Sequence, residues 1–186
     1  MISSKDISVA PDDTPFWQFS GSVYGRRGVA EACLALQERH RLDVNLLLFC
    51  AWAGSNGRRL DGGDLGLLRS AVRPWHDQVV APLRQVRRWL KQQTSVPEDV
   101  GEAFREEVKA LELQAEMLEQ LMLYQEHEVA PGDGAPEDVA ANLLLYLTRF
   151  KPRPTDDDIA DLAAILHGAC PEVAPVHAIR ILEDGA

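Results

Sequence analysis

The chain has 186 residues, of which 46% are hydrophobic and 26% charged, values that are ordinary for a soluble globular protein and exclude a disordered one. This length suits one domain with a sizeable core. The formal net charge of −10 is unevenly spread, because residues 58–91 carry net +5 and residues 92–186 carry net −14. One region is therefore expected to neutralise another or to bind a partner.

Several classes of protein are excluded by local composition. The longest apolar run, Val44–Gly54, is interrupted by Asn45 and falls well short of the roughly 20 residues that a membrane-spanning helix needs. The segment MISSKDISVAPDD has no apolar stretch of the signal-peptide kind. Cys33, Cys50 and Cys170 are odd in number and form no CxxC pair. We therefore expect a cytoplasmic protein with buried, inert thiols, without membrane contact, metal or cofactor.

Helix signals recur along the chain and strand signals are nearly absent, which predicts an all-α fold. We expect residues 1–13 to form a flexible leader and residues 14–186 one helical domain. Thr14 is a plausible N-cap and Pro15 suits the first turn, so a short aromatic helix, PFWQFSGSVYG, is predicted to begin there. The next segment, GVAEACLALQERH, is amphipathic, with an apolar face of Val29, Ala32, Cys33 and Leu36.

The stretch LDVNLLLFCAWAG predicts a core helix. The Asp43 carboxylate can accept the free amides of the first turn and suits the positive end of the helix dipole. Asn45 falls in the same turn, where a polar side chain can face water or bond locally. Apolar residues then run almost all round the cylinder, as in a helix that is buried on most sides. We interpret the two polar residues as a helix start and not as a ligand site.

Glycine and proline divide the rest of the chain. Loops are predicted near residues 54–63 and 130–136, and the first of them leads to a helix near 64–72. Pro74 is expected to restart the chain, and Pro82 to open the helix LRQVRRWLKQQ.

The second half contains the longest predicted helix, from Pro97 to about Glu128. Two further helices are predicted over EDVAANLLLYLTRF and DDDIADLAAILHG, and a last short one after Pro171 or Pro175. The expected fold is a single-domain irregular helical bundle of about seven to nine helices, organised around the long central helix.

The long helix carries two apolar stripes. The first steps by four and three residues like a heptad seam, and comprises Phe104, Val108, Leu111, Ala115, Leu118 and Met122. The second projects from roughly the opposite side, and comprises Leu113, Met117, Leu121 and Tyr124. Such a helix either threads the centre of a bundle or offers its second stripe to another chain. The second set is therefore our candidate partner-binding surface.

A basic stripe stands at i, i+3, i+4 and i+7 on one predicted helix, and comprises Arg84, Arg87, Arg88 and Lys91. It could hold phosphates of a nucleic acid, or it could pair with acidic residues of the long helix or of a protein partner. The second alternative is favoured, because the rest of the chain is strongly acidic and long-range attraction to a polyanion would be weak.

No catalytic motif is present, but two arrangements could carry chemistry. A small-ligand site requires a concave pocket in which charges converge with any of five candidates: Trp17, Tyr24, Trp52, Trp75 or His76. Asp157, Asp158 and Asp161 spell DDxxD, a pattern that isoprenoid synthases use to hold magnesium. The alternative is a capping box, in which Thr155 and Asp158 open the helix.

Two segments resemble a known family: PFWQFSGSVYGRRGVAEACLALQERHRLDVNLLLFCAWAG and RPWHDQVVAPLRQVRRWLK. They look like a family of small proteobacterial proteins catalogued as domain of unknown function 2390. The resemblance implies a mainly helical, cytoplasmic bacterial protein, and it brings no catalytic residue with it.

These observations favour an interaction or regulatory protein without catalytic activity, which binds a protein partner or itself through helix surfaces. Nucleic-acid binding through the basic stripe is the first alternative, and a small-ligand or magnesium-dependent enzyme is the second.

Overall fold

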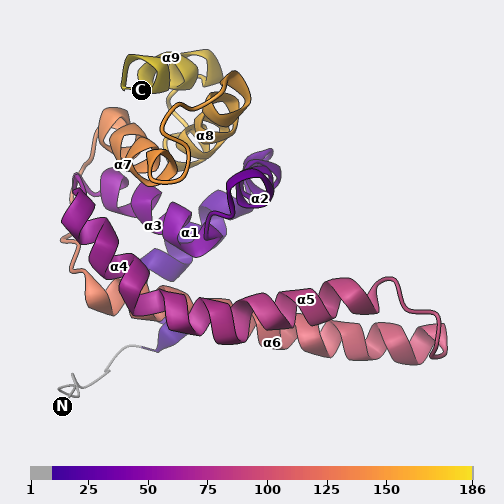
Figure 1. Ribbon diagram of the computed structural model, residues 1–186. Coiled ribbons are helices and arrows are strands. Elements are labelled where there is room, and N and C mark those ends of the chain that lie inside the picture. Colours follow the sequence, from indigo (N-terminus) through magenta and orange to yellow (C-terminus); the bar gives the residue numbers. More distant parts are fainter. Residues whose placement is uncertain (1–9, 186) are drawn as a thin grey trace.

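The computed structural model describes residues 10–185, and within that range it contains helices and no strand (Figure 1). The prediction of an all-α, irregular helical bundle is confirmed. In chain order the α-helices are α1 (Pro15–Tyr24), α2 (Val29–His40), α3 (Val44–Ser55), α4 (Gly62–Trp75), α5 (Ala81–Leu90), α6 (Glu98–Glu126), α7 (Pro136–Thr148), α8 (Asp156–Ala169) and α9 (Pro175–Gly185).

The start of the described chain is helical where a leader was expected. Residues 1–9 of that leader lie outside the described part, but Pro11–Asp13 form a 3₁₀ turn. Thr14 then caps α1, because its hydroxyl accepts a hydrogen bond from the Trp17 amide over 3.1 Å. The predicted start of this helix is confirmed.

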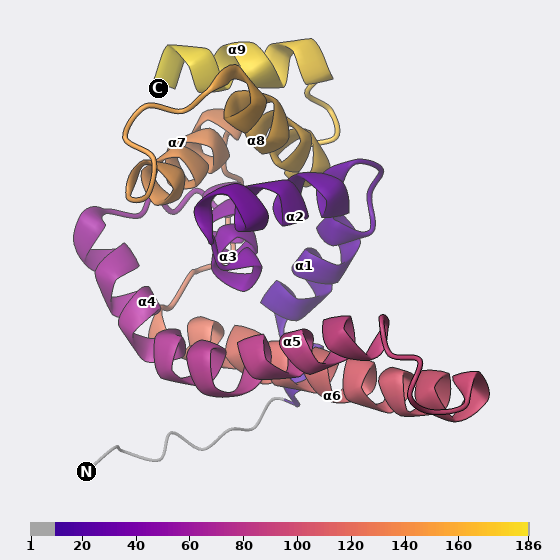
Figure 2. The same ribbon diagram turned by 45° about the vertical axis from the view of Figure 1, so that its right-hand side comes forward.

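Helix α3 is the centre of the fold. Every residue from Asn45 to Gly54 is buried, and α1, α2, α7 and α8 all contact this helix. Figure 2 shows α3 in the middle of the molecule, with α7, α8 and α9 stacked on one side of it. Asp43 caps α3 by accepting the Asn45 amide over 2.9 Å. The prediction of a capped core helix is confirmed.

The close packing of α3 on α7 depends on glycine. A Cβ atom on Gly54 would lie 2.5 Å from the Cα atom of Val139, well inside van der Waals contact. The backbones of the two helices therefore approach each other more closely than any other residue at position 54 allows.

Helices α4 and α5 form one bent rod, contrary to the predicted restart at Pro74. Pro74 lies inside α4, and a π-helical turn, His76–Val80, connects α4 directly to α5. Proline removes one backbone donor and crowds the preceding turn, and π-turns are a common way for a helix to accommodate such an interruption.

Helices α5 and α6 form an antiparallel hairpin, which we call the arm (residues 81–126). The arm projects from the body of α1–α3 and α7–α9, with the α5–α6 loop at its tip (Figures 1 and 2). Only the second half of α6 packs against α1 and α3. The sequence analysis expected the long helix to form the centre of the bundle, and this expectation is wrong because α3 lies there instead.

The first apolar stripe of α6 is only partly buried. Val108 and Ala115 are covered, but Phe104, Leu111 and Leu118 are 52%, 52% and 38% exposed. The helix instead turns polar residues inward, and Glu112, Glu119 and Gln120 are all buried. The heptad pattern was therefore misleading about which face of α6 packs on the rest of the chain.

Candidate functional site

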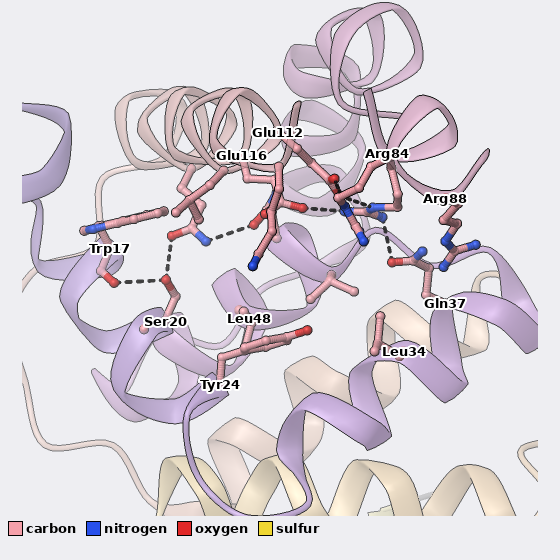
Figure 3. Close-up of a pocket in the computed structure, with 17 residues that line it drawn as sticks. Trp17, Ser20, Tyr24, Leu34, Gln37, Leu48, Arg84, Arg88, Glu112 and Glu116 are labelled. Carbon is pink, nitrogen blue, oxygen red and sulfur yellow. Dashed lines mark hydrogen bonds and ion pairs between the residues drawn. The ribbon is translucent and has the colours of Figure 1, made fainter. Parts of the chain in front are cut away.

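A cavity of about 370 Å³ lies where the arm meets the body, between α1, α2, α3, α5 and α6 (Figure 3). Apolar side chains line one part of it, including Trp17, Tyr24 and Leu48. Charged side chains from the arm line the other part: Arg84, Arg87, Arg88, Lys109, Glu112 and Glu116. We call this cavity the cleft. It combines an aromatic wall with several charges of both signs.

Arg84 is the central cation of the cleft. Its Nε atom donates to Glu112 over 3.0 Å, one Nη atom donates to Gln37 over 2.7 Å, and the other donates to Glu116. Arg87 also donates to Glu112, through two of its nitrogens. Despite its burial, Glu112 has a pKa below its ordinary value, because hydrogen bonds from Arg87 and Arg84 favour its carboxylate. These ion pairs connect α5 to α6 along the base of the arm.

The basic stripe therefore pairs within the chain, which confirms the intramolecular alternative for Arg84 and Arg87. Arg88 is half exposed and lies 3.6 Å from Glu38 of α2. Lys91 is exposed beyond the end of α5 and does not line the cleft. The structure brings the first three members of the stripe together at the cleft and separates the fourth from them.

A buried chain of hydrogen bonds runs from the cleft into the joint between α3 and α6. Ser20 donates to Gln120 over 2.7 Å, and Gln120 donates to Asn45 over 2.9 Å. Asn45 in turn donates to Glu119 over 2.7 Å. Asn45 was expected to face water or to bond locally, but it is 6% exposed and bonds to residues about 75 positions away.

The chain of hydrogen bonds ends at three ionisable groups. His76 Nδ1 lies 3.1 Å from Glu119 Oε1 and 3.4 Å from Asp43 Oδ2. The hydrogen bond with Glu119 raises the pKa of His76, and burial together with the nearby Glu119 carboxylate raises the pKa of Asp43 to about 7. We call Asp43, His76 and Glu119 the acid–histidine cluster.

The five aromatic candidates for a ligand pocket do not converge as a group. Trp17 and Tyr24 line the cleft. Trp52 packs in the core against Phe16, Phe49 and Tyr124, and Trp75 donates from its indole nitrogen to the Ala115 carbonyl over 2.9 Å. His76 belongs to the acid–histidine cluster and borders a second cavity of about 320 Å³, next to the cleft.

The four candidate partner-binding residues of α6 also separate. Leu121 is 8% exposed, and Tyr124 is half-buried against Trp52, so both contribute to the core. Met117 is half-buried, and Leu113 is 55% exposed but lines the cleft. Sequence reasoning placed the free apolar surface on this side of α6 because it took the first stripe to be the buried one.

The larger free apolar surface lies on the first stripe of α6. Val100 is 57% exposed, and Phe104, Leu111 and Leu118 follow at spacings of four, seven and seven residues. These four side chains share one side of the helix, and we call them the arm stripe. Among residues 10–185, eight of the twelve large hydrophobic residues that are well exposed lie between positions 86 and 118, so exposed apolar area is concentrated on the arm.

The DDxxD segment acts as a capping box. Thr155 accepts a hydrogen bond from the Asp158 amide over 3.2 Å, and Asp158 accepts one from the Thr155 amide over 2.9 Å. Asp158 is fully buried and also contacts Arg39 and His40. The capping interpretation of this motif is therefore confirmed.

All three cysteines are buried and free, and burial raises the pKa of the Cys33 thiol to about 12.

Together, these features define an all-α protein with a cleft lined by aromatic and charged side chains and a projecting, partly apolar arm. The chain belongs to the family described as "Protein of unknown function (DUF2390)", whose model matches residues 15–123. The matched segment runs from α1 through most of α6 and so contains the cleft, the acid–histidine cluster and the arm stripe. No curated protein and no solved structure matches the chain. Within residues 10–185, every helix is too short or too polar to span a bilayer.

Proposed function

We propose that this chain is an interaction protein that binds a helix of another protein on the arm stripe. The observation that carries the proposal is the alignment of Val100, Phe104, Leu111 and Leu118 on one side of a projecting helix, each 38–57% exposed. Seven-residue spacing is the geometry with which one helix packs along another. Contiguous exposed apolar surface of this kind is typical of protein-binding sites.

Charge indicates the kind of helix that would bind. Glu107 lies on the same side of α6 as the stripe, between Phe104 and Leu111, and it is exposed. The second half of the chain, which includes α6, carries net −14. A partner helix with lysine or arginine beside its apolar positions would be attracted, whereas a second copy would bring another acidic helix. We therefore infer a basic amphipathic helix as the partner.

Ion pairs and a hydrogen bond join α5, α6 and α4 at the base of the arm. Arg84 and Arg87 pair with Glu112 at its base, and Trp75 anchors α4 to the α6 backbone at Ala115. A preformed helix face loses little conformational entropy on binding, which favours affinity.

A designed amphipathic peptide tests the proposal directly. Fluorescence anisotropy with a helical peptide whose leucines follow i, i+4 and i+7 and are flanked by lysine should show binding. The variant Phe104→Ser/Leu111→Ser should weaken that binding at least tenfold. A peptide with glutamate flanks should also bind more weakly. Val176→Ser is the matched control, because Val176 is 65% exposed on α9, away from the arm.

Two results would contradict the proposal. Equal binding by the arm variant and the wild type would remove the arm stripe as the site. A stable dimer in sedimentation equilibrium, abolished by Phe104→Ser/Leu111→Ser, would show that the stripe binds a second copy and not a basic partner.

A second candidate function is the binding of a small anionic molecule in the cleft. Its volume of about 370 Å³ lies in the range of ligand sites, and aromatic side chains line it together with the exposed cations Arg88 and Lys109. A thermal-shift screen with phosphorylated metabolites, with and without magnesium, tests this candidate, and flat responses would count against it. Nucleic-acid binding has less support, because Arg84 and Arg87 are already paired with glutamates.

A further inference from the structure

We propose that Asp43, His76 and Glu119 form a binding site for one divalent transition-metal ion of the zinc class. The three residues come from three separate elements: the N-cap of α3, the start of the π-helical turn and the buried half of α6. Each residue offers one ligand atom, and these atoms all lie within 4.8 Å of one another. The inference is independent of partner binding by the arm stripe.

The spacing of the ligand atoms fits an ion. Zinc bonds to histidine nitrogen and carboxylate oxygen are about 2.0–2.1 Å long, so neighbouring ligand atoms of a tetrahedral site lie about 3.3 Å apart. His76 Nδ1 lies 3.1 Å from Glu119 Oε1 and 3.4 Å from Asp43 Oδ2. These two distances match those between neighbouring ligands of one ion, and all three ligand atoms lie within 4.8 Å of one another.

Both carboxylates are oriented by hydrogen bonds through their other oxygen. Asp43 Oδ1 accepts the backbone amides of Asn45 and Leu46, and Glu119 Oε2 accepts the Asn45 side-chain amide. This leaves Asp43 Oδ2 and Glu119 Oε1 directed at the same histidine nitrogen. Outer hydrogen bonds that fix ligand orientation in this way are characteristic of metal sites.

The electrostatics of the cluster also favour a cation. The Glu119 side chain is fully buried, and the side chains of Asp43 and His76 are 15% and 23% exposed. Two carboxylates so close together in a poorly hydrated place repel each other unless a proton, such as one on His76, or a metal cation lies between them. A divalent ion supplies two positive charges, and an imidazole ligand favours zinc, nickel or copper over magnesium and manganese.

At His76 the site borders a cavity that gives room for a further ligand. His76 borders the cavity of about 320 Å³ that Arg41, Arg84 and Arg88 also line. Three protein ligands leave at least one coordination position for water or for an anion. The nearby guanidinium groups would favour an anionic fourth ligand. His76 also begins a π-turn, a feature found frequently at functional sites.

Calorimetric titration of the tag-free full chain, freed of metal by a chelator, tests the inference. Zn²⁺ should bind with one ion per chain, Co²⁺ should give visible absorption bands, and Mg²⁺ should bind at least tenfold more weakly than Zn²⁺. His76→Gln and Glu119→Gln should each weaken Zn²⁺ binding at least tenfold. The matched control is His177→Gln, since His177 is exposed on α9.

Folding of the variants is checked by far-UV circular dichroism. Asp43→Asn is a further variant, because asparagine is a good N-cap and keeps the start of α3 intact. It should lose Zn²⁺ binding and keep its helicity. The inference is wrong if the wild type binds neither Zn²⁺ nor Co²⁺, if the cluster variants bind Zn²⁺ as the wild type does, or if Mg²⁺ binds as tightly as Zn²⁺.

Discussion

The side-chain amide of Asn45 donates a 2.7 Å hydrogen bond to Glu119, and both residues are buried. Asn45 also accepts a hydrogen bond from Gln120, so one side chain of α3 satisfies two polar side chains of α6. In the described residues every buried side-chain nitrogen or oxygen has a hydrogen-bond partner, and this includes those at the joint between body and arm. The joint should therefore be sensitive to any change that removes a single partner.

Asn45→Ala should lower the free energy of unfolding by about 2–4 kcal/mol, because Glu119 loses a donor and Gln120 an acceptor in a buried place. Urea unfolding followed by circular dichroism measures this change. Asn56→Ala is the control, because Asn56 is only half-buried and bonds near the end of α3. Equal losses in the free energy of unfolding for the two variants would show that the buried hydrogen bonds of Asn45 stabilise the chain no more than those of Asn56.

Arg84→Met should destabilise the chain by about 2–4 kcal/mol, because Glu112 is left with a weaker set of partners in a buried position. Adding Glu112→Gln should recover part of that loss, so a double-mutant cycle should give a coupling energy of at least about 1 kcal/mol. Arg73→Met, which removes an exposed pair with Asp77, should cost no more than about 0.5 kcal/mol. Strict additivity of Arg84→Met and Glu112→Gln would contradict the role assigned to this ion pair.

The helix starts could be predicted from the sequence because capping is local chemistry. Thr14, Asp43 and Thr155 each accept an amide two or three residues ahead, so a short window of sequence contains the whole interaction. The same holds for the buried face of α2 and for the core position of α3, where composition alone indicates burial.

The cleft and the acid–histidine cluster could not be predicted in this way. Ser20 and Gln120 are 100 residues apart, and Asn45 and Glu119 are 74 apart. Only the packing of α6 on α1 and α3 brings them together. The sequence also does not indicate which face of α6 packs on the rest of the chain. The buried face carries Glu112, Glu119 and Gln120, whereas Phe104 and Leu111 are exposed. Burial of polar groups by mutual pairing leaves no periodic apolar signal.

Gly54→Ala should destabilise the chain by about 3 kcal/mol, because the added Cβ atom would overlap the α7 backbone at Val139, which cannot move aside easily. Gly66→Ala is the matched control at an exposed position of α4, where an added Cβ atom meets nothing within 4 Å. It should stabilise the chain by about 0.5–1 kcal/mol through helix propensity. The midpoints of thermal unfolding should therefore shift in opposite directions. A Gly54→Ala midpoint at or above that of the wild type would contradict the close α3–α7 approach.

Asp158 should make stability depend on pH under acidic conditions. Burial alone would raise the pKa of Asp158, but hydrogen bonds with Thr155, His40 and Arg39 outweigh it and hold that pKa well below its usual range. A carboxyl group whose pKa is lowered by folding stabilises the protein fully above its unfolded pKa of about 3.9. This contribution is lost as the pH falls below about 4 towards the lower folded pKa.

Asp158→Asn should therefore lower the free energy of unfolding by about 2–4 kcal/mol at pH 7 and by distinctly less at pH 3. Urea unfolding at both pH values measures the difference, with the exposed Asp157→Asn as control. A cost of Asp158→Asn that is the same at pH 7 and pH 3 would show that the ionised carboxylate is not what stabilises the contact between α2 and α8.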